Sequence, residues 1–378
     1  MSINPLLESM TPYRPGRSIE SVKRQYQLSQ VIKLASNENP LGPSPKALAA
    51  IAKYAAESHL YPDGSSSELT EKLASHHQVP YDHICLGNGS DELFDQLIRI
   101  YVDPGEAVLV SQGAFNAYAL SALAHRASVI EVPLRSDFQI DLEAFDHVLR
   151  TRLKENKIRL VFIPNINNPT GLLLPYQEIV NFLEKWGRNP EVLIVIDEAY
   201  HHFISSSQYR SACQFQKEFP SLIVSRTFSK SYGLAGLRLG YLIAPSQVCT
   251  YIHRVRKPFN VNRLAQKAGL AALDDHDFLE RSQQLIRQEK VKIRDFLAEH
   301  QISFLPSEGN FYMINMKRDL KLVEEFFLKH GVIIRPVDNY GFTTWIRVSV
   351  GLPEENTKML LVLEECFRKI EELPDHRY

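Results

Sequence analysis

One amine stands in the middle of the run SRTFSKSYGLAGLR, residues 225–238, where Lys230 is surrounded by hydroxyls and small residues. Lysine condenses with aldehydes as a Schiff base, so Lys230 could hold the aldehyde of pyridoxal phosphate, while Thr227, Ser229 and Arg238 could bind its phosphate by hydrogen bonds and charge. Lysines beside serines are also common on solvated turns. The run therefore indicates a cofactor site only if other parts of the chain bring groups to the same place.

The overall composition points to a protein that acts on small molecules. A chain of 378 residues is long enough for a sizeable core and favours two domains over one. Its 43 basic and 44 acidic residues balance, so the sequence has no excess of positive charge that would indicate binding to nucleic acid or to an anionic membrane. The N-terminal stretch lacks an apolar core of signal-peptide length, and no apolar run approaches a membrane span. We therefore expect a soluble, cytoplasmic protein with no nucleic-acid or membrane partner.

Neither cysteine nor histidine is spaced as a metal site. Cys85, Cys213, Cys249 and Cys366 are scattered and form no Cys-x-x-Cys pair, so they indicate reduced thiols and not a zinc site or a disulfide framework. The 13 histidines include adjacent pairs but no His-Glu-x-x-His spacing. We expect no metal.

Amphipathic stretches alternate with short β-branched runs between residues 46 and 256, which predicts helices crossing over a largely parallel sheet. The expected helices span residues 46–58, 66–76, 91–101, 116–125, 142–150 and 175–186. The expected strands span residues 83–86, 107–110, 128–132, 159–163, 192–196 and 222–224, with a further strand-like run at 237–244. Ligands of such sheets bind at the carboxyl ends of the strands.

The remainder of the chain has a different pattern. A long charged amphipathic helix is expected at 277–299, followed by strands at 304–306, 311–315, 332–336 and 345–350 and a closing helix at 353–372. This order predicts a smaller α+β domain packed on the first, with a cleft between them. We expect an N-terminal arm over residues 1–32, a large cofactor-binding domain over 33–257 and a small C-terminal domain over 258–378.

Asp197 follows the apolar run 192–196, at the edge of a buried strand. A carboxylate there needs a partner, because burying it alone is costly. A protonated pyridine nitrogen would be such a partner, and Asp197 would keep that ring cationic and able to accept electrons. Tyr200, close by, could donate to the ring's phenolic oxygen. The alternative for Asp197 is a helix N-cap.

Two more turns follow strands of the same sheet. Asn168, in the run NINNPTG at 165–171, precedes a proline that favours an extended backbone, so its amide can point at the same phenolic oxygen. Gly89, Ser90 and Asp91 open an expected helix, where backbone amides make a phosphate cradle. The run GNGSDE at 87–92 is neither a dinucleotide fingerprint nor a P-loop. Phe115, past another strand end, is either a ring that stacks on the cofactor or a core aromatic.

These residues belong to a longer series of motifs. In order they are KLASNENPLGPSP at 33–45, YPDG at 61–64, GSD at 89–91, NPTG at 168–171, DEAY at 197–200, Ser229-Lys230 with Arg238, and VIIRP at 332–336 followed by RVSVG at 347–351. From about residue 13 to 356 the chain closely resembles the histidinol-phosphate aminotransferases. Several motifs are shared by all fold-type I pyridoxal phosphate aminotransferases, whereas the NENP opening and the Arg335 motif point to the histidinol-phosphate branch.

The resemblance implies a fold-type I α/β enzyme that binds pyridoxal 5'-phosphate and forms a homodimer with the active site at the interface. Tyr61 would reach the cofactor phosphate of the neighbouring subunit. Lys230 would form the Schiff base and then carry the proton between substrate and cofactor carbons, with Asp197 and Tyr200 tuning the ring. The implied reaction converts histidinol phosphate and 2-oxoglutarate into imidazole acetol phosphate and glutamate, in histidine biosynthesis.

The resemblance also implies which residues bind the substrate. Arg347 is the family's fork for a substrate carboxylate, which suits glutamate and 2-oxoglutarate. Histidinol phosphate presents a phosphate instead, and Arg335 is the family's candidate for a second cation, with Tyr13 and Asn39 as further substrate-binding positions. Two purely structural alternatives stay open: Arg335 could form a surface ion pair, and Tyr13 could anchor the N-terminal arm.

Some positions depart from the family pattern. Phe115 stands where many members carry tyrosine, Gly113 stands where many carry proline or histidine, and the three serines at 65–67 are unusual. Stacking survives the change to phenylalanine, but the shape of the pocket changes. An aminotransferase for phenylalanine or tyrosine is therefore the first alternative, and a pyridoxal phosphate decarboxylase or lyase is the second. A transcription regulator built on an aminotransferase domain is disfavoured, because the charge is neutral and no helix-turn-helix pattern is present.

Overall fold

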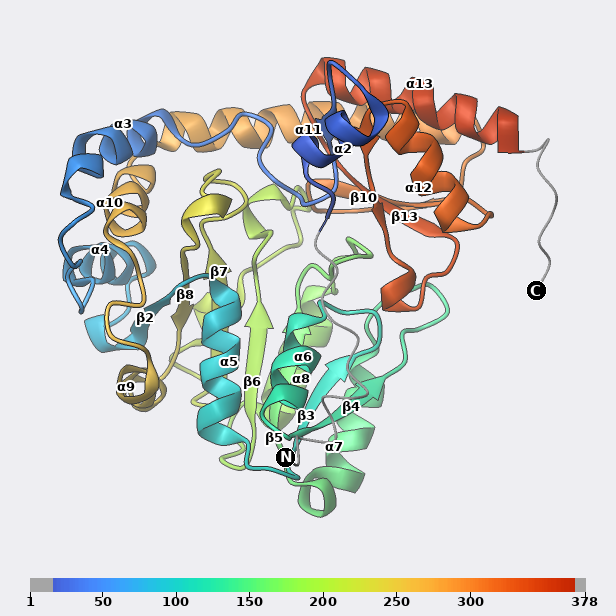
Figure 1. Ribbon diagram of the computed structural model, residues 1–378. Helices are drawn as coiled ribbons and strands as arrows, with labels where there is room; N and C mark the ends of the chain where they lie inside the picture. The colour runs from blue at the N-terminus through green and yellow to red at the C-terminus, as the bar shows by residue number, and fades with distance from the viewer. Residues whose placement is uncertain (1–15, 371–378) are drawn as a thin grey trace, which may run out of the picture.

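Within residues 16–370, the part of the chain that the computed structural model describes, seven strands form the central sheet. Their spatial order is β2-β8-β7-β6-β5-β3-β4 (Figure 1). β8 is antiparallel to both of its neighbours, and the other neighbouring strands pair in parallel. The strands are β2 (Ile84–Gly87), β3 (Ala107–Ser111), β4 (Ser128–Val132), β5 (Ile158–Pro164), β6 (Leu193–Asp197), β7 (Leu222–Thr227) and β8 (Gly240–Ile243). The prediction of a largely parallel sheet is confirmed.

Helices cover both faces of this sheet, because successive strand side chains point to opposite sides. Val195 belongs to a buried cluster with α5, α6 and α9, whereas Ile194 and Ile196 belong to a cluster with α4, α7, α8 and α10. The helices are α3 (Pro45–Tyr54), α4 (Ser67–His77), α5 (Ser90–Tyr101), α6 (Ala117–Ala124), α7 (Leu142–Asn156), α8 (Tyr176–Trp186), α9 (Ser246–Val255) and α10 (Arg263–Ala272). Because both faces are covered, the inner strands β3, β5 and β6 are mainly apolar, whereas the edge strand β4 is partly exposed.

A second, antiparallel sheet carries the C-terminal part of the chain in the order β12-β13-β10-β9. Its strands are β9 (Phe304–Leu305), β10 (Phe311–Asn315), β12 (Arg335–Pro336) and β13 (Trp345–Ser349). It packs with α11 (His276–Glu299), α12 (Leu320–Lys329) and α13 (Pro353–Ile370) in one apolar cluster. In Figure 1, α11 runs along the top of the molecule from the side of α3 and α10 to α13, so it joins the two parts.

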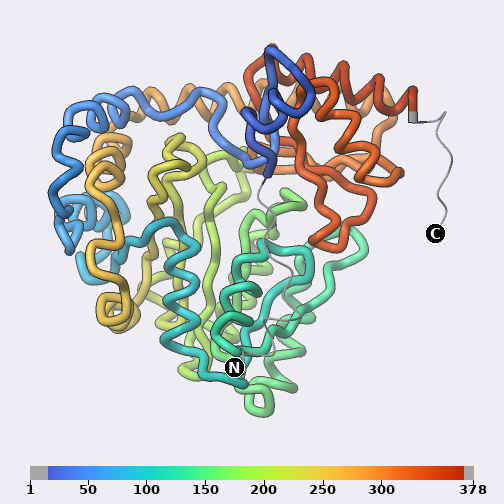
Figure 2. Tube along the Cα trace, in the orientation of Figure 1, coloured from blue at the N-terminus to red at the C-terminus, as the bar shows by residue number. Residues whose placement is uncertain are grey.

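The beginning of the described chain lies against its end. β1 (Ile32–Lys33) pairs in parallel with β11 (Val332–Ile333), and α2 (Ile19–Tyr26) packs beside α12. Figure 2 shows this as the blue segment lying on the orange and red part. From there the chain runs across to α3, and the segment between them passes the ends of the central strands.

The structure differs from the sequence predictions in several elements. Helices α2, α9, α10 and α12 were not predicted, and the single strand expected at 332–336 is divided between two sheets. Helix α10 was not predicted because its small residues give only a weak apolar periodicity, although they allow the helix to pack closely against its neighbours. A Cβ on Gly269 would lie 2.5 Å from Leu239 Cδ2. None of the helices within residues 16–370 is long and apolar enough to cross a membrane.

The division of the chain into arm, large domain and small domain remains a prediction. One observation bears on its second boundary, expected after residue 257. Helix α10 contributes Ala265, Ala268 and Ala272 to the buried cluster on the central sheet. This packing favours a boundary between α10 and α11.

Candidate active site

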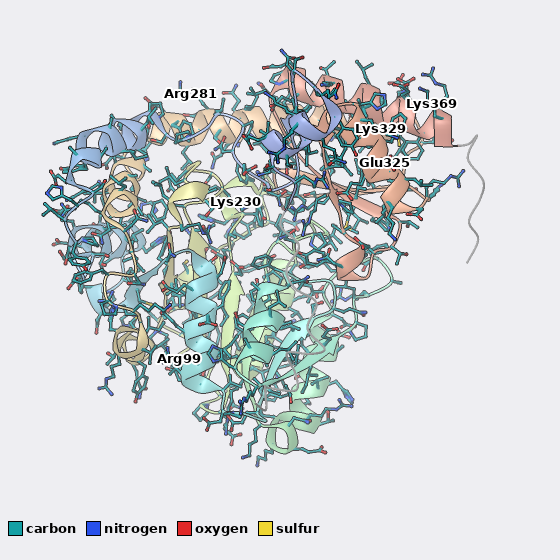
Figure 3. All side chains as sticks on the ribbon, viewed as in Figure 1. Arg99, Lys230, Arg281, Glu325, Lys329 and Lys369 are labelled. Carbon is teal, nitrogen blue, oxygen red and sulfur yellow. The ribbon has the colours of Figure 1, made fainter. Side chains whose placement is uncertain are left out.

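A cavity of about 530 Å³ opens at the carboxyl ends of β5, β6 and β7, between the central sheet and the C-terminal part. Lys230 stands in it, close to the centre of the molecule (Figure 3). Besides Lys230, the polar residues that line it come from segments far apart in the chain: Ser36, Asn37, Glu38, Ser90, Asp91, Tyr118, Ser121, Asn168, Asp197, Tyr200, Thr227, Ser229, Arg238, Arg335, Tyr340 and Arg347. This convergence is what a parallel sheet provides at its carboxyl edge.

The amine of Lys230 projects from the turn after β7 and donates to the backbone oxygen of Ser36 at 3.0 Å. It also lies 5.6 Å from the ring centre of Tyr200. Burial lowers the pKa of Lys230 to about 8, and the positive charge of Arg347 acts in the same direction. A larger share of neutral amine is therefore present near neutral pH than for an exposed lysine, which suits a nucleophile or a general base.

Asp197 ends β6 with its carboxylate buried and facing the cavity. The hydroxyl of Tyr118 donates to its Oδ2 at 2.7 Å, and the backbone N–H of Ala199 donates to Oδ1 at 3.2 Å. Burial raises the pKa of Asp197 to about 6, although both hydrogen bonds oppose that rise. A cationic partner in the cavity would favour the charged carboxylate, and a protonated ring nitrogen is such a partner.

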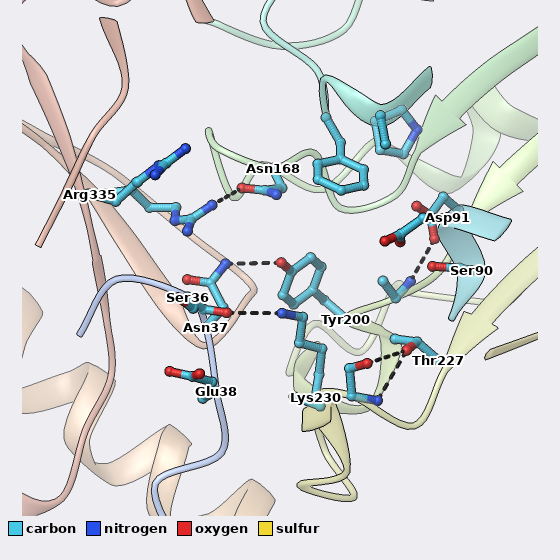
Figure 4. Close-up of a pocket in the computed structure, with 18 of the residues that line it drawn as sticks. Ser36, Asn37, Glu38, Ser90, Asp91, Asn168, Tyr200, Thr227, Lys230 and Arg335 are labelled. Atoms are coloured by element: carbon cyan, nitrogen blue, oxygen red, sulfur yellow. Dashed lines mark hydrogen bonds between the residues drawn. The ribbon is translucent and has the colours of Figure 1, made fainter. Parts of the chain in front are cut away.

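Tyr200 lies beside Lys230 and is held from the other side of the cavity by Asn37 (Figure 4). The Asn37 Nδ2 group donates to the Tyr200 hydroxyl oxygen at 2.9 Å. Burial raises the pKa of Tyr200, so the hydroxyl keeps its proton at neutral pH. Asn168 faces the same region, and its Oδ1 accepts from Arg347 Nη1 at 2.5 Å.

One end of the cavity has the groups that a phosphate needs. Thr227 Oγ1 contacts Ser229 Oγ at 3.0 Å and accepts from the Ser229 N–H at 3.1 Å. Arg238 Nη2 donates to Asp91 Oδ2 at 2.9 Å, in the first turn of α5. Gly89 precedes that helix with a φ of +86°, and a Cβ there would lie 2.3 Å from Arg238 Nη2. Hydroxyls, a guanidinium and a helix N-terminus around a glycine fit a bound phosphate.

The opposite end of the cavity is cationic. Arg335 and Arg347 are both buried and both line it. Arg347 is fixed by Asn168 and by the backbone oxygen of Ala35, to which its Nη2 donates at 2.6 Å. The cavity therefore pairs a phosphate-binding end with an arginine end, and the lysine stands between them.

The comparisons with known proteins identify this arrangement. Residues 29–362 match the family described as aminotransferase class I and II. The histidinol-phosphate aminotransferase of Bdellovibrio bacteriovorus is 46% identical over 371 residues, which cover 98% of this chain and 99% of that protein. This chain belongs to the histidinol-phosphate aminotransferase family. Its relative of that name in an Anaeromyxobacter species is 42% identical, with 96% and 98% of the two chains covered.

A solved structure within this aminotransferase family has the same fold. Histidinol-phosphate aminotransferase from Sinorhizobium meliloti, in complex with pyridoxal-5'-phosphate, superposes with a TM-score of 0.86 at 28% identity. The match covers 97% of this chain and 98% of that one. The predicted fold class, fold-type I α/β with a large mostly parallel sheet and a smaller α+β part, is confirmed.

Most of the predicted site residues of this family member meet at one cavity. Lys230, Asp197 and Tyr200 all line it. The other predicted residues that line it are Ser90, Asp91, Phe115, Asn168, Thr227, Ser229, Arg238, Arg335 and Arg347. Gly89 adjoins it as the residue before α5. The assignment of a role to each remains a prediction.

Besides Gly89, two predicted residues within residues 16–370 are not among those that line it. Tyr61 is 77% exposed and stacks on Phe259 with ring centres 4.5 Å apart. Asn39 is buried, and its amide donates to Ser231 O at 2.9 Å and to Ser282 Oγ at 2.8 Å. Tyr13 lies outside the described residues.

Two of the residues missed by sequence reasoning hydrogen-bond through their side chains to predicted catalytic residues. Asn37 lies inside a motif on which the resemblance rested, but it was given no role. Tyr118 lay within a predicted helix, and nothing in its neighbourhood indicated that it would reach Asp197 from another element. Only the packing of α6 against the sheet brings that hydroxyl to the carboxylate.

Proposed function

We propose that this protein binds pyridoxal 5'-phosphate and transfers an amino group from L-histidinol phosphate to 2-oxoglutarate, giving imidazole acetol phosphate and L-glutamate in histidine biosynthesis. The observation that carries the proposal is the placement of Lys230 in one cavity with Asp197, a phosphate-binding end and two buried arginines. The relatives at 46% and 42% identity that bear the name histidinol-phosphate aminotransferase support this choice of substrate.

The residues fit the cofactor at both of its ends. Ser90, Thr227, Ser229 and Arg238 would hold the phosphate, and Asp197 would pair with the ring nitrogen. When bound, the cofactor supplies an aldehyde that condenses with amines and a ring that accepts the electron pair released at the substrate carbon. The side chains of the Arg238–Asp91 ion pair are partly exposed in the cavity, so a phosphate can compete for the guanidinium.

Within that frame the protein side chains have separate tasks. With the cofactor bound, Lys230 Nζ would accept the proton from the substrate carbon and donate it on the cofactor side, and its lowered pKa, about 8, suits it as a base near neutral pH. Tyr200 and Asn168 hold the phenolic oxygen of the ring. Asp197 keeps the ring nitrogen protonated, because its buried carboxylate is stabilised by a positive neighbour.

The two arginines select the substrates. Arg347, fixed by Asn168 and Ala35, presents a fork for the carboxylate of 2-oxoglutarate or glutamate. The phosphate of histidinol phosphate carries nearly two negative charges, so Arg335 and Arg347 together match it. Both side chains are buried, so their attraction for an anion is weakly screened by water.

We further propose that the active protein is a homodimer with a shared active site. Tyr61 is not among the residues that line the cavity of its own chain, and its ring is exposed and stacks on Phe259. Its backbone oxygen is held by Arg263 Nη2 at 2.8 Å, which fixes the loop. This presentation suits a residue that reaches the cofactor phosphate of a neighbouring subunit.

We also propose a cytoplasmic location. Cys85, Cys249 and Cys366 are buried free thiols, and Cys213 is a partly buried one. Free thiols persist in a reducing compartment.

The absorbance of the cofactor tests the proposed reaction. Addition of histidinol phosphate to the pyridoxal phosphate-loaded protein should convert the spectrum to that of the amine form, and 2-oxoglutarate should restore it. Phenylalanine serves as a parallel donor. Conversion by phenylalanine without a response to histidinol phosphate would assign the protein to aromatic amino acids, and release of carbon dioxide or loss of dependence on an oxo acid would assign it to decarboxylation or elimination.

A further inference from the structure

Three consecutive residues touch three different members of the site. The backbone oxygen of Ala35 accepts from Arg347, that of Ser36 accepts from Lys230, and the side chain of Asn37 donates to Tyr200. Figure 4 shows this segment on the opposite side of the cavity from the central sheet. Two of these contacts use backbone atoms and are independent of side-chain identity. The third depends on Asn37 itself.

The orientation of the Asn37 amide is decided by Ser349. The Ser349 Oγ accepts from the Asn37 backbone N–H at 2.8 Å, so its own proton is free to donate to Asn37 Oδ1, which lies at 2.9 Å. A hydroxyl has one proton, and an amide has one acceptor end and one donor end. The Oδ1 end therefore faces Ser349, and the Nδ2 end faces Tyr200.

This orientation leaves the proton of Tyr200 for the cavity. The Nδ2 group only donates, so it occupies a lone pair of the Tyr200 oxygen and cannot accept the phenol's proton. The proton must point elsewhere, and Tyr200 lines the cavity. Because Asn37, Tyr200 and Ser349 are all buried, water does not compete for these bonds.

The backbone of Asn37 is also suited to this task. Its φ of +54° is in the left-handed region, which asparagine tolerates better than most residues. The Asn310 Nδ2 group donates to the Asn37 backbone oxygen at 3.1 Å and fixes that conformation. Ser349 lies on β13, the strand that carries Arg347, so the arginine strand and the phenol are joined through one side chain.

We propose that Asn37 is a positioning residue that holds Tyr200 as a proton donor toward the cofactor's phenolic oxygen, and that Ser349 sets the orientation in which it does so. The inference rests on the proposed function, since it takes pyridoxal phosphate as the group in the cavity. Asn37 acts through Tyr200 and not on the substrate. It links the substrate-binding strand to the group that tunes the cofactor.

The test is the pH midpoint of the bound cofactor's absorbance, measured alongside kcat and KM. Tyr200→Phe should raise the midpoint by about 0.5–1 pH unit, since a net hydrogen bond of roughly 1 kcal/mol to the deprotonated oxygen is lost. Asn37→Asp places an acceptor where the donor was, so it should draw the phenol's proton away and raise the midpoint equally. Asn37→Gly keeps the left-handed backbone and should raise it by less. In Tyr200→Phe and Asn37→Asp kcat should fall about 5-fold or more, and in Asn37→Gly by less, with KM changed by less than about 2-fold in all three.

Matched variants separate this route from a general structural effect. Gln78→Gly likewise introduces glycine at a residue with a φ of +54°, but outside the site, and should leave the midpoint in place. Ser349→Ala should reproduce the Asn37→Gly shift, and Ser349→Thr, which keeps the hydroxyl, should restore the wild-type value. In a Tyr200→Phe background, Asn37→Gly should add no further shift.

Three results would overturn the proposal: an unchanged midpoint in both Asn37 variants, a shift that persists in the Tyr200→Phe background, or equal shifts for the two Ser349 variants. Failure of the proposed function has a different appearance in the unmodified protein: it would show no cofactor absorbance if pyridoxal phosphate does not bind, or a cofactor absorbance that histidinol phosphate does not change if the reaction is a different one.

Discussion

Arg335 and Arg347 lie directly opposite one another on the neighbouring antiparallel strands β12 and β13. Both are buried, with 9% and 6% of their surfaces exposed. Like charges at directly opposed positions of a sheet repel, and burial strengthens that repulsion. Both guanidiniums line the cavity, so under the proposed function an anion that contacts both would offset this repulsion, and a phosphate dianion would offset more of it than a single carboxylate.

Replacement of Arg335 should separate the two substrates. Arg335→Gln should raise the KM for histidinol phosphate by about 10- to 100-fold, because a charge-assisted hydrogen bond to the phosphate is lost. The KM for 2-oxoglutarate should change by less than about 3-fold, since Arg347 keeps its fork. Steady-state kinetics with each substrate varied in turn measure the effect, and Arg335→Lys, which keeps the charge, should fall between. Equal losses for both substrates would contradict the division of roles.

The pKa of Lys230 predicts how cofactor capture depends on pH. Burial and Arg347 lower that pKa to about 8, so the neutral amine, and with it the rate of capture by the apoprotein, should rise about tenfold per pH unit up to about pH 8 and then level off. Arg347→Gln removes one cause of the lowering and should move the break to higher pH. Stopped-flow absorbance after mixing with pyridoxal phosphate gives the profile. A break that stays in place in this variant would show that Arg347 does not act on the amine.

Tyr118 should matter to the cofactor without touching the substrate. In Tyr118→Phe the Asp197 carboxylate loses the hydroxyl that donates to it at 2.7 Å, so the pKa of Asp197, already raised to about 6, should rise further. The acid limb of kcat/KM should move to higher pH, and the dissociation constant of pyridoxal phosphate should increase about 5- to 10-fold. Tyr251→Phe, a similar change on α9, is the control and should leave both values unchanged. If both variants gave the same pH profile and the same dissociation constant, the Tyr118 hydroxyl would have no role in cofactor binding or in the pKa of Asp197.

Two partly buried histidines predict a loss of stability in acid. Burial, aided by the positive charge of Arg226, lowers the pKa values of His77 and His202 to about 3. Between about pH 6.5 and pH 3 the unfolded chain therefore binds protons that the folded chain refuses, so the free energy of unfolding should fall as the pH is lowered through that window. Each histidine contributes at most about a tenfold change in the unfolding equilibrium per pH unit.

Urea unfolding at a series of pH values measures this loss. His77→Gln should reduce the pH dependence below pH 6.5, because glutamine has no proton to gain. His147→Gln, at an exposed position on α7, is the matched control and should leave the slope as it is. A slope that His77→Gln does not change would show that His77 is protonated in the folded protein.

Much of the fold could be predicted from the sequence, because the hydrophobic pattern of the central strands and of the longer helices is strong. Strands such as β6 are buried on both faces, and so appear as continuous apolar runs. Short helices such as α9 and α10 were missed because their apolar faces are narrow or built from alanine. The expected strand at 332–336 was divided because its two halves pair with different partners, β1 and β13, and no local pattern contains that choice.

The sequence by itself determined the chemistry at single positions: a lysine among hydroxyls, an aspartate after an apolar strand, and arginines in the last motifs. These depend on residue type and on local strand and turn patterns, which are readable along the chain. Only the tertiary structure decided that Tyr118 reaches Asp197, that Asn37 reaches Tyr200, and that Arg335 faces Arg347. The physical reason is that hydrogen bonds and charge repulsion act across a few ångströms of space, and folding brings those groups together from distant parts of the chain.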